Sequence, residues 1–354
     1  MKKTSLWTIM INGICIFFMI LFLLDKKLFF SEEENRFLEP FHWNNVDTYI
    51  NDHFPFRIKF IQLKNRFQKK IGKTYINQIY IGADDYLIPD FIKTDKEDFI
   101  MKSINQFQEK NNNVDVMIIP DSILINEDKL SYHKKIEEEQ EIKKLYSRLK
   151  TNNISVIPIF QEYHKNGYEL YYKTDHHWNM LGAYLAYQEY QKSKGKEYYQ
   201  LNQFEKETIS TDFLGTSYYQ VLGIGKAEEM VLYTKGNKLS VNYVYEKRKT
   251  TTLYESKYLK TRDKYSYFLD NNHALIQIDN HSIKNNSRLL IIKNSFANSM
   301  IPFLINNYHT IDVIDLRYFQ ESVSDYCREN KITNILILYN LNNLYQDLSI
   351  IKLK

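Results

Sequence analysis

Five short apolar runs, separated by stretches with helical spacing, constrain the fold of this chain most. The runs are the segments Val114 to Ile119, Ile154 to Ile159, Leu289 to Ile292, Thr310 to Ile314 and Ile335 to Tyr339. Helical spacing of apolar residues is found between them, at residues 97–110 and 134–149. Continuous apolar strands that alternate with helices form parallel sheets covered on both faces. The sequence therefore predicts an α/β domain whose reactive groups lie beyond the carboxyl ends of its strands.

Two other regions have different patterns. Residues 47–71 have helical spacing interrupted by Pro55, and residues 78–81 and 86–88 predict the two strands of a hairpin. Residues 195–285 contain alternating runs and few long helical patterns. We expect this last region to be a mixed, strand-rich insertion in a domain that spans residues 47–354.

The amino terminus predicts a membrane anchor. Residues Thr4 to Leu24 carry no charge and are mostly Leu, Ile, Phe and Met. A helix of this length is long enough to cross the hydrocarbon core of a bilayer. No small-residue cleavage site follows, so we expect an uncleaved signal-anchor within residues 1–27, with the amino terminus in the cytoplasm. Residues 28–46 would be a stalk and the remainder would be extracytoplasmic. A buried helix of a soluble protein is the alternative.

Composition excludes several classes of protein. The 354 residues have a net charge of +4, and the basic residues are scattered apart from Lys247 to Lys249. Such a short run is more often a solvated strand or turn than a nucleic-acid patch. We therefore expect no nucleic-acid partner. The two cysteines, Cys15 and Cys327, leave no disulfide framework in the soluble part.

The stretch from Lys173 to Asn179 carries a candidate acid–base pair. In an extended segment, side chains two residues apart point to the same side, so Asp175 can accept the Nδ1 proton of His177 and leave Nε2 free as a base. Asn179 is a good N-cap for the helical pattern that follows. One alternative is that Asp175 and His177 only stabilise the fold. Another is a metal site in which His176 and Asp121 take part, although nothing in the sequence requires a metal.

A candidate nucleophile comes much later in the chain. Ser295 lies on the polar turn between a buried strand and a helix, where the hydroxyl of a nucleophile elbow is placed. The alternative is that Ser295 only caps the helix. The Ser295 N–H, a neighbouring N–H and the amides of Asn294 or Asn298 are candidate oxyanion donors. Ser217 is the second candidate nucleophile, in a loop of small and aromatic residues typical of sugar contacts or of packing corners.

These motifs together resemble the DHHW family. The resemblance rests on four stretches between about residues 30 and 345: Asp175 to Trp178, Glu33 to Arg36 with Asp52 to Arg57, Gly215 with Thr216, and Lys293 to Ser299. The family is similar in turn to the acetyltransferases of alginate O-acetylation, which have a permuted SGNH-hydrolase-like fold. The resemblance implies that fold here, with Asp175 and His177 as acid and base and Ser295 as the serine.

Other residues of these motifs are candidates for substrate or oxyanion contacts, namely Asn294, Asn298, Gly215, Thr216, His176 and Trp178. The family more often has Asp where this chain has Asn294. The resemblance implies an O-acetyltransferase that moves acetyl through an acetyl-serine to a cell-surface or secreted polysaccharide. It also implies a multi-spanning membrane acyltransferase as the acetyl donor, and no cofactor. A carbohydrate esterase with the same triad and a non-catalytic glycan-assembly protein are the alternatives.

Overall fold

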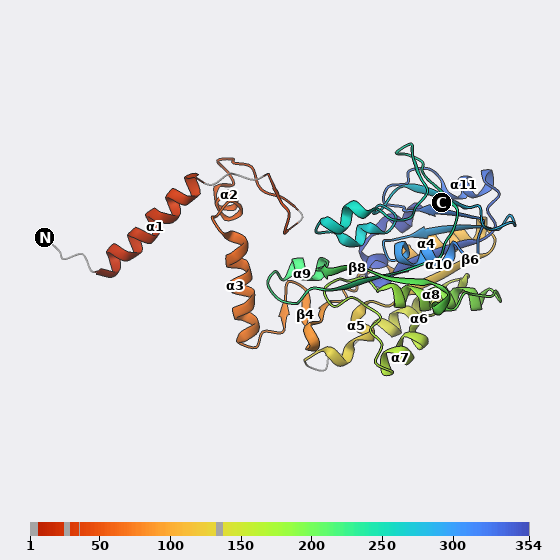
Figure 1. Cartoon of the computed structure of the whole chain (residues 1–354), viewed down its shortest axis with the longest axis horizontal. Coiled ribbons are helices and arrows are strands. Elements are labelled where there is room, and N and C mark those ends of the chain that lie inside the picture. The colour runs from red at the N-terminus through yellow and green to blue at the C-terminus, as the bar shows by residue number, and fades with distance from the viewer. Residues whose placement is uncertain (1–5, 25–28, 35, 132–136, 354) are drawn as a thin grey trace.

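An eight-stranded mixed sheet forms the centre of the α/β body in the computed structural model of the chain (Figure 1). The structure describes residues 6–24, 29–34, 36–131 and 137–353. The strand order is β11–β10–β12–β14–β13–β15–β6–β7. The strands are β6 (Val114–Ile119), β7 (Asn152–Asn153), β10 (Leu239–Tyr243), β11 (Arg248–Thr250), β12 (Leu275–Asn280), β13 (Arg288–Lys293), β14 (Thr310–Ile314) and β15 (Ile335–Asn340).

The prediction of a parallel sheet is correct for only part of it. Strands β14, β13, β15, β6 and β7 are parallel neighbours. Strands β12, β10 and β11 extend the sheet in antiparallel pairs beyond β14. The buried β6, β13 and β15 are continuous apolar runs because both their faces are covered, whereas the alternating pattern of β10 belongs to a less covered strand.

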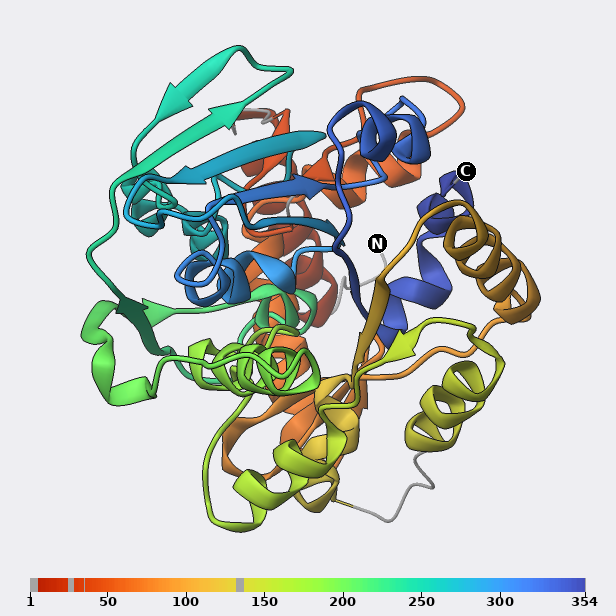
Figure 2. The ribbon, with the colours of Figure 1, turned by 90° about the vertical axis from the view of Figure 1, so that its right-hand side faces the viewer.

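Helices cover both faces of the sheet. Helices α8 and α10 pack together on one side, and α4 lies with η6 on the other; β15 runs beside β6 between them (Figure 2). The helices of the body are α4 (Glu97–Lys110), α5 (Ser122–Ile125), α6 (Glu138–Arg148), α7 (Ile157–Lys165), α8 (Met180–Ser193), α9 (Thr216–Gln220), α10 (Ala297–Leu304), α11 (Val323–Glu329) and α12 (Leu341–Gln346). Short 3-10 helices are η1 (Ala83–Asp85), η2 (Glu127–Lys129), η3 (Leu201–Gln203), η4 (Ser256–Lys260), η5 (Lys264–Tyr267) and η6 (Leu348–Lys352).

One predicted strand is wrong. The apolar run Ile154 to Ile159 is not extended, because helix α7 begins at Ile157 with Pro158 in its first turn. Proline is tolerated there because the first N–H groups of a helix have no partner within it. The parallel neighbour of β6 is instead the two-residue strand β7, just before the run. The predicted helix at 134–149 is observed as α6, and its residues 134–136 lie outside the described residues.

The region between residues 195 and 285 contributes to two sheets. Strands β8 (Glu205–Phe213) and β9 (Glu228–Thr234) form a separate antiparallel pair. Strands β10, β11 and β12 belong to the large sheet. A smaller three-stranded sheet of β3 (Tyr75–Ile76), β4 (Ile79–Ile81) and β5 (Leu87–Pro89) contains the predicted hairpin.

The amino-terminal elements project from this body (Figure 1). They are α1 (Leu6–Leu24), the paired strands β1 (Phe30–Ser31) and β2 (Arg36–Phe37), α2 (Val46–Asp52) and α3 (Arg57–Lys70). The chain breaks between α2 and α3 around Pro55, as predicted. Across the described part of the chain, no helix combines the length and the apolar character that crossing a membrane requires. The charged residues that would flank the expected anchor lie outside the described residues.

Ion pairs hold the predicted stalk to the end of α2 and to the start of α3. Asp52 accepts two hydrogen bonds from the Arg36 guanidinium, and Glu34 pairs with Arg57. The hydrogen bonds from Arg36 lower the pKa of Asp52 to about 2, against the effect of its burial. Arg262 donates to the carbonyl of Glu32, so this segment also contacts the body.

Candidate active site

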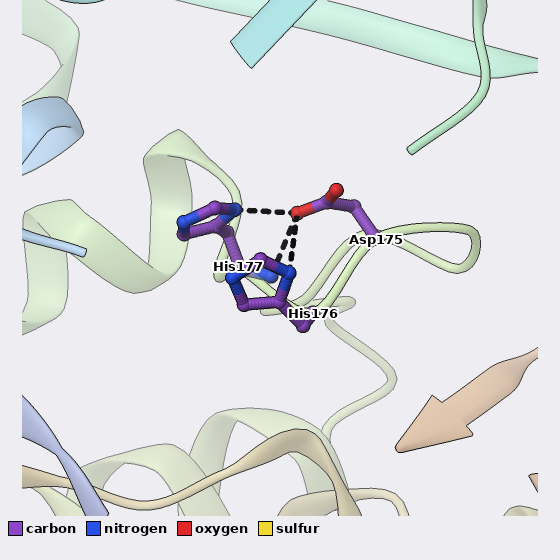
Figure 3. A group of neighbouring side chains, drawn as sticks. All are labelled: Asp175, His176 and His177. Atoms are coloured by element: carbon purple, nitrogen blue, oxygen red, sulfur yellow. Dashed lines mark hydrogen bonds and ion pairs between the residues drawn. The ribbon is translucent and has the colours of Figure 1, made fainter. Parts of the chain in front are cut away.

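Asp175 and His177 meet on the loop that precedes helix α8 (Figure 3). Oδ1 of Asp175 lies 2.5 Å from Nδ1 of His177 and also accepts the His177 backbone N–H at 2.9 Å. The loop is closed by a bridge between Tyr171 and Trp178, and Asn179 caps α8 by accepting two backbone N–H groups. Both members of the pair are buried, so their geometry is fixed from several sides.

Ser295 reaches this pair from the other half of the chain. It follows β13, which lies between β14 and β15 in the sheet, and it precedes α10. Its Oγ lies 2.7 Å from Nε2 of His177. With the Nδ1 proton of His177 directed to Asp175, Nε2 accepts the hydroxyl proton. The structure thus brings the three predicted side chains into one hydrogen-bonded row, and the serine is the most exposed of them.

Backbone and side chain of α9 hold the second oxygen of Asp175. Oδ2 accepts the Thr216 N–H at 2.7 Å and the Thr216 hydroxyl at 3.0 Å. Burial alone would raise the pKa of Asp175, but attraction to His177 and His176 and these hydrogen bonds lower it well below its usual range. Gly215 lets the backbone before α9 come close to the Asp175 carboxylate, because a Cβ on this residue would lie 2.6 Å from the Asp175 carboxyl carbon. Gly215 and Thr216 therefore position the carboxylate.

His176 lies beside the row. Its ring stacks 3.8 Å from that of His177, and its Nδ1 is 2.5 Å from the Thr216 hydroxyl. Because that hydroxyl donates to Asp175, it accepts from His176, which leaves Nε2 of His176 as an acceptor. Desolvation and, to a smaller extent, repulsion from His177 lower the pKa of His176 to about 4. The side chain is nevertheless 31% exposed. The imidazole is therefore neutral at neutral pH.

Two aromatic residues fix the histidine and serine segments relative to each other. The indole N–H of Trp178 donates to the Phe296 carbonyl and to the Ser299 hydroxyl, so this residue is a buried link and not a substrate contact. The Tyr265 ring stacks on His177 at 3.7 Å and 8°. Its hydroxyl also contacts Ser299 at 3.0 Å. Tyr265 carried no sequence signal, because it lies in an irregular segment far from both motifs.

The predicted amide donors are used elsewhere. The Asn294 side-chain amide donates to Asn340, and that of Asn298 donates to the Asn271 carbonyl. Within the described residues, the Ser295 N–H has no acceptor, so it stays a candidate oxyanion donor. Ser217 is wholly buried on α9, and its hydroxyl has no partner among the described residues; it does not belong to the row.

Among the described residues, those of the same loop offer a possible metal site. In the described part of the chain, the donor atoms of Asp175, His176 and His177 form the single group close enough to share an ion, within 4.8 Å of one another. Asp121 does not join it, because its carboxylate accepts from the Asn340 side chain and the Asn342 backbone. Both nitrogens of His177 have hydrogen-bond partners, so binding a metal there would break the row.

Two cavities border the site. One, of about 310 Å³, is lined by His176, Thr216, Asp121 and a cluster of side-chain amides that includes Asn340 and Asn342. The other, of about 230 Å³, lies on the far side of Asp175. It is lined by Tyr219, Tyr258, Arg262, Asp263 and residues around Gly215. A molecule with several hydroxyl groups fits such surfaces, because they offer both donors and acceptors.

The sequence matches one known protein family. The model of that family, described as DHHW protein, matches residues 68–314, which leaves the stretches Glu33 to Arg36 and Asp52 to Arg57 outside the matched range. None of the curated proteins compared with the sequence matches it.

Solved structures share the fold. A DHHW family protein from Eubacterium siraeum is 21% identical, has a TM-score of 0.66 and covers 78% of this chain and 95% of its own. Bacillus cereus PatB1 with a sulfonyl adduct is 23% identical, with a TM-score of 0.66 and coverages of 78% and 98%. The O-acetyltransferase domain of Pseudomonas putida AlgJ is 11% identical, has a TM-score of 0.47 and covers 77% of this chain and 94% of that domain.

Proposed function

The chain belongs to the DHHW family, and we propose that it is a polysaccharide O-acetyltransferase that works through an acetyl-Ser295 intermediate. The observation that carries this proposal is the row of hydrogen bonds from Asp175 through His177 to Ser295. A serine activated by an adjacent histidine, which is oriented in turn by a carboxylate, is the arrangement of covalent acyl transfer. The resemblance of the sequence motifs to the acetyltransferases of alginate O-acetylation agrees with this reaction class.

The first half-reaction acetylates the serine. His177 Nε2 removes the hydroxyl proton as Ser295 Oγ attacks the acetyl carbonyl, and the Ser295 N–H donates to the oxyanion. Collapse of the tetrahedral intermediate breaks the bond to the donor oxygen, which leaves with the proton from His177. Asp175 stabilises the imidazolium throughout and remains ionised, because its neighbours hold its pKa low.

The second half-reaction transfers the acetyl group to a sugar. His177 removes a proton from the acceptor hydroxyl, the hydroxyl oxygen attacks the acetyl carbonyl, and Ser295 leaves with the proton. The cavity beside His176 supports a glycan acceptor, because its lining is dominated by amides and carboxylates. Nε2 of the neutral His176 can accept a hydrogen bond from a second hydroxyl of the sugar.

The proposed cellular setting follows from the amino terminus. We place the body outside the cytoplasm, with residues 1–27 as the signal-anchor and a multi-spanning membrane acyltransferase as the acetyl donor. The support is the charge-free composition of Thr4 to Leu24 and the exposure of apolar side chains along α1, such as Ile9, Ile14 and Phe17. A soluble body tethered at a membrane would be held close to a donor within it.

An acetyl-transfer assay tests the reaction. The chain is incubated with an activated acetyl ester, with and without cell-surface oligosaccharides, and both protein and sugars are analysed by mass spectrometry. We expect acetyl on Ser295 and on the sugar, and we expect Ser295→Ala to lose both while keeping its circular dichroism spectrum. Release of acetate with no acetylated sugar would indicate an esterase, which uses water as the acceptor. Unchanged transfer by Ser295→Ala would contradict the proposal.

A further inference from the structure

Helix α3 presents its apolar side chains away from the body of the protein. Phe60, Leu63 and Phe67 are 45%, 59% and 62% exposed, and Phe56 and Ile71 at its two ends are also exposed. With 3.6 residues per turn, all five lie on one face. A helix that packs on a protein core normally buries such a face.

The opposite face of α3 holds the helix to the body with polar groups. The buried Asn65 side chain donates to the Leu222 carbonyl at 3.1 Å, and Arg66 Nε donates to the Gly223 carbonyl at 2.9 Å. Gln62 packs closely against Gly223. These contacts of the inward face, where Ile58 and Ile61 are also half-buried, orient the exposed apolar face outward.

Lysines border this apolar face on both sides. At 100° per residue, Lys59 and Lys70 lie along one edge and Lys64 along the other. All three have no carboxylate within ion-pair distance among the described residues, and α3 contains no acidic residue. An apolar strip edged by unpaired lysines is the pattern of helices that lie in the interface of anionic membranes.

Helix α1 continues the same apolar surface. The Phe18 ring stacks on Phe54 at 5.3 Å and approaches Phe60 at 6.1 Å, and Phe22 meets Tyr49 of α2. These contacts place the outward face of α3 next to the segment of the chain that is most apolar. Figure 1 shows α1, α2 and α3 on the same side of the body.

We propose that the outward face of α3, formed by Phe56, Phe60, Leu63, Phe67 and Ile71, lies on an anionic lipid surface. The five apolar side chains enter the boundary between headgroups and acyl chains, while Lys59, Lys64 and Lys70 bind lipid phosphates. A lipid surface fits better than a protein partner, because lysine is depleted at protein interfaces and enriched beside anionic membranes. This contact fixes the orientation of the body relative to the membrane.

Fluorescence of a labelled position on α3 tests the proposal in the full chain. An environment-sensitive fluorophore is attached to Leu63→Cys in a Cys15→Ser background, because Cys327 is buried. The matched control carries the label at Phe99→Cys on α4, where the native side chain is 61% exposed. Each protein is reconstituted with vesicles of phosphatidylcholine alone or mixed with phosphatidylglycerol.

We expect a blue shift at position 63 on the mixed vesicles, a smaller shift on phosphatidylcholine alone and none at position 99. Lys59→Glu with Lys64→Glu and Lys70→Glu should abolish the shift. Lys102→Glu with Lys110→Glu and Lys165→Glu, which change exposed lysines of other helices, should keep it. An equal response at both labelled positions, or insensitivity to the α3 lysines, would overturn the proposal. A shift seen only after the membrane acyltransferase is added would assign the face to a protein partner instead.

Discussion

The carboxylate of Asp175 is the most constrained group of the site. Each of its two oxygens accepts two hydrogen bonds, one oxygen from His177 and the other from Thr216. Burial raises the pKa of this acid, but attraction to His177 and His176 and these hydrogen bonds favour the ionised form and lower the pKa. The orientation of His177 consequently depends on Thr216 as well as on Asp175.

Gly215→Ala tests this dependence. The new Cβ would overlap the Asp175 carboxylate and push it away from His177. We expect kcat/KM for acetyl transfer to fall by roughly 100-fold, since a misplacement of about 1 Å has effects of that size. Gly236→Ala is the control, because a Cβ there meets nothing within 4 Å, and it should leave kcat/KM unchanged. Equal activity of the two variants would contradict the role given to Gly215.

At the scale of elements, the spacing of apolar residues predicted the bounds of individual helices and strands. Helix α4 and strand β6 have the predicted bounds, because their periodicity and length agree with their burial. The strand predicted at Ile154 to Ile159 is wrong, because a short apolar run fits a buried strand and a buried helix equally well. Ser295, Asp175 and His177 could be named from turn and spacing signals.

The surroundings of the site could not be predicted in this way. The stacking of Tyr265 on His177 and the contact of Gly215 with Asp175 join segments that only the folded chain brings together. The contacts of the Asn294 and Asn298 amides could not be predicted for the same reason. Their partners, Asn340 and the Asn271 carbonyl, come from distant segments.

A buried acid pair links strand β6 to helix α6. Glu138 accepts the Asp121 N–H, and its other oxygen has no partner among the described residues. Burial raises the pKa of Asp121 to about 6 and, together with Asp121, raises that of Glu138 well above its usual range. The folded protein therefore holds a proton that the unfolded chain has released, and its stability falls as pH rises from about 4 through 6 and beyond.

Glu138→Gln should remove the part of this pH dependence that Glu138 contributes. The amide keeps an oxygen for the Asp121 N–H and carries no charge. We expect the free energy of unfolding to rise by about 1 kcal/mol at pH 8 and to change little at pH 4, because one pKa unit corresponds to about 1.4 kcal/mol. Denaturant unfolding at the two pH values measures it. A variant that is destabilised equally at both would show that the pair is not titrating.

At the scale of the whole molecule, the amino-terminal helices and the α/β body have separate tasks in this account. The body contains the row of reactive side chains, and we propose that α1 and α3 hold it at a membrane. We expect the full chain to remain in the membrane fraction after an alkaline carbonate wash. Ile14→Lys with Ile16→Lys in α1 should release it, and Phe99→Lys in α4 should not. Retention of the α1 variant would contradict the anchor.

The central claim is that Ser295 is the nucleophile and that His177 activates it. A sulfonyl fluoride is a suitable probe, because it reacts with a serine hydroxyl that an adjacent base activates. The full chain is treated with the reagent and digested, and the labelled peptide is identified by mass spectrometry. We predict a single sulfonyl group on Ser295, slower labelling in His177→Ala and none at this position in Ser295→Ala. Labelling at another serine with Ser295 unmodified, or a rate that His177→Ala does not change, would contradict the account.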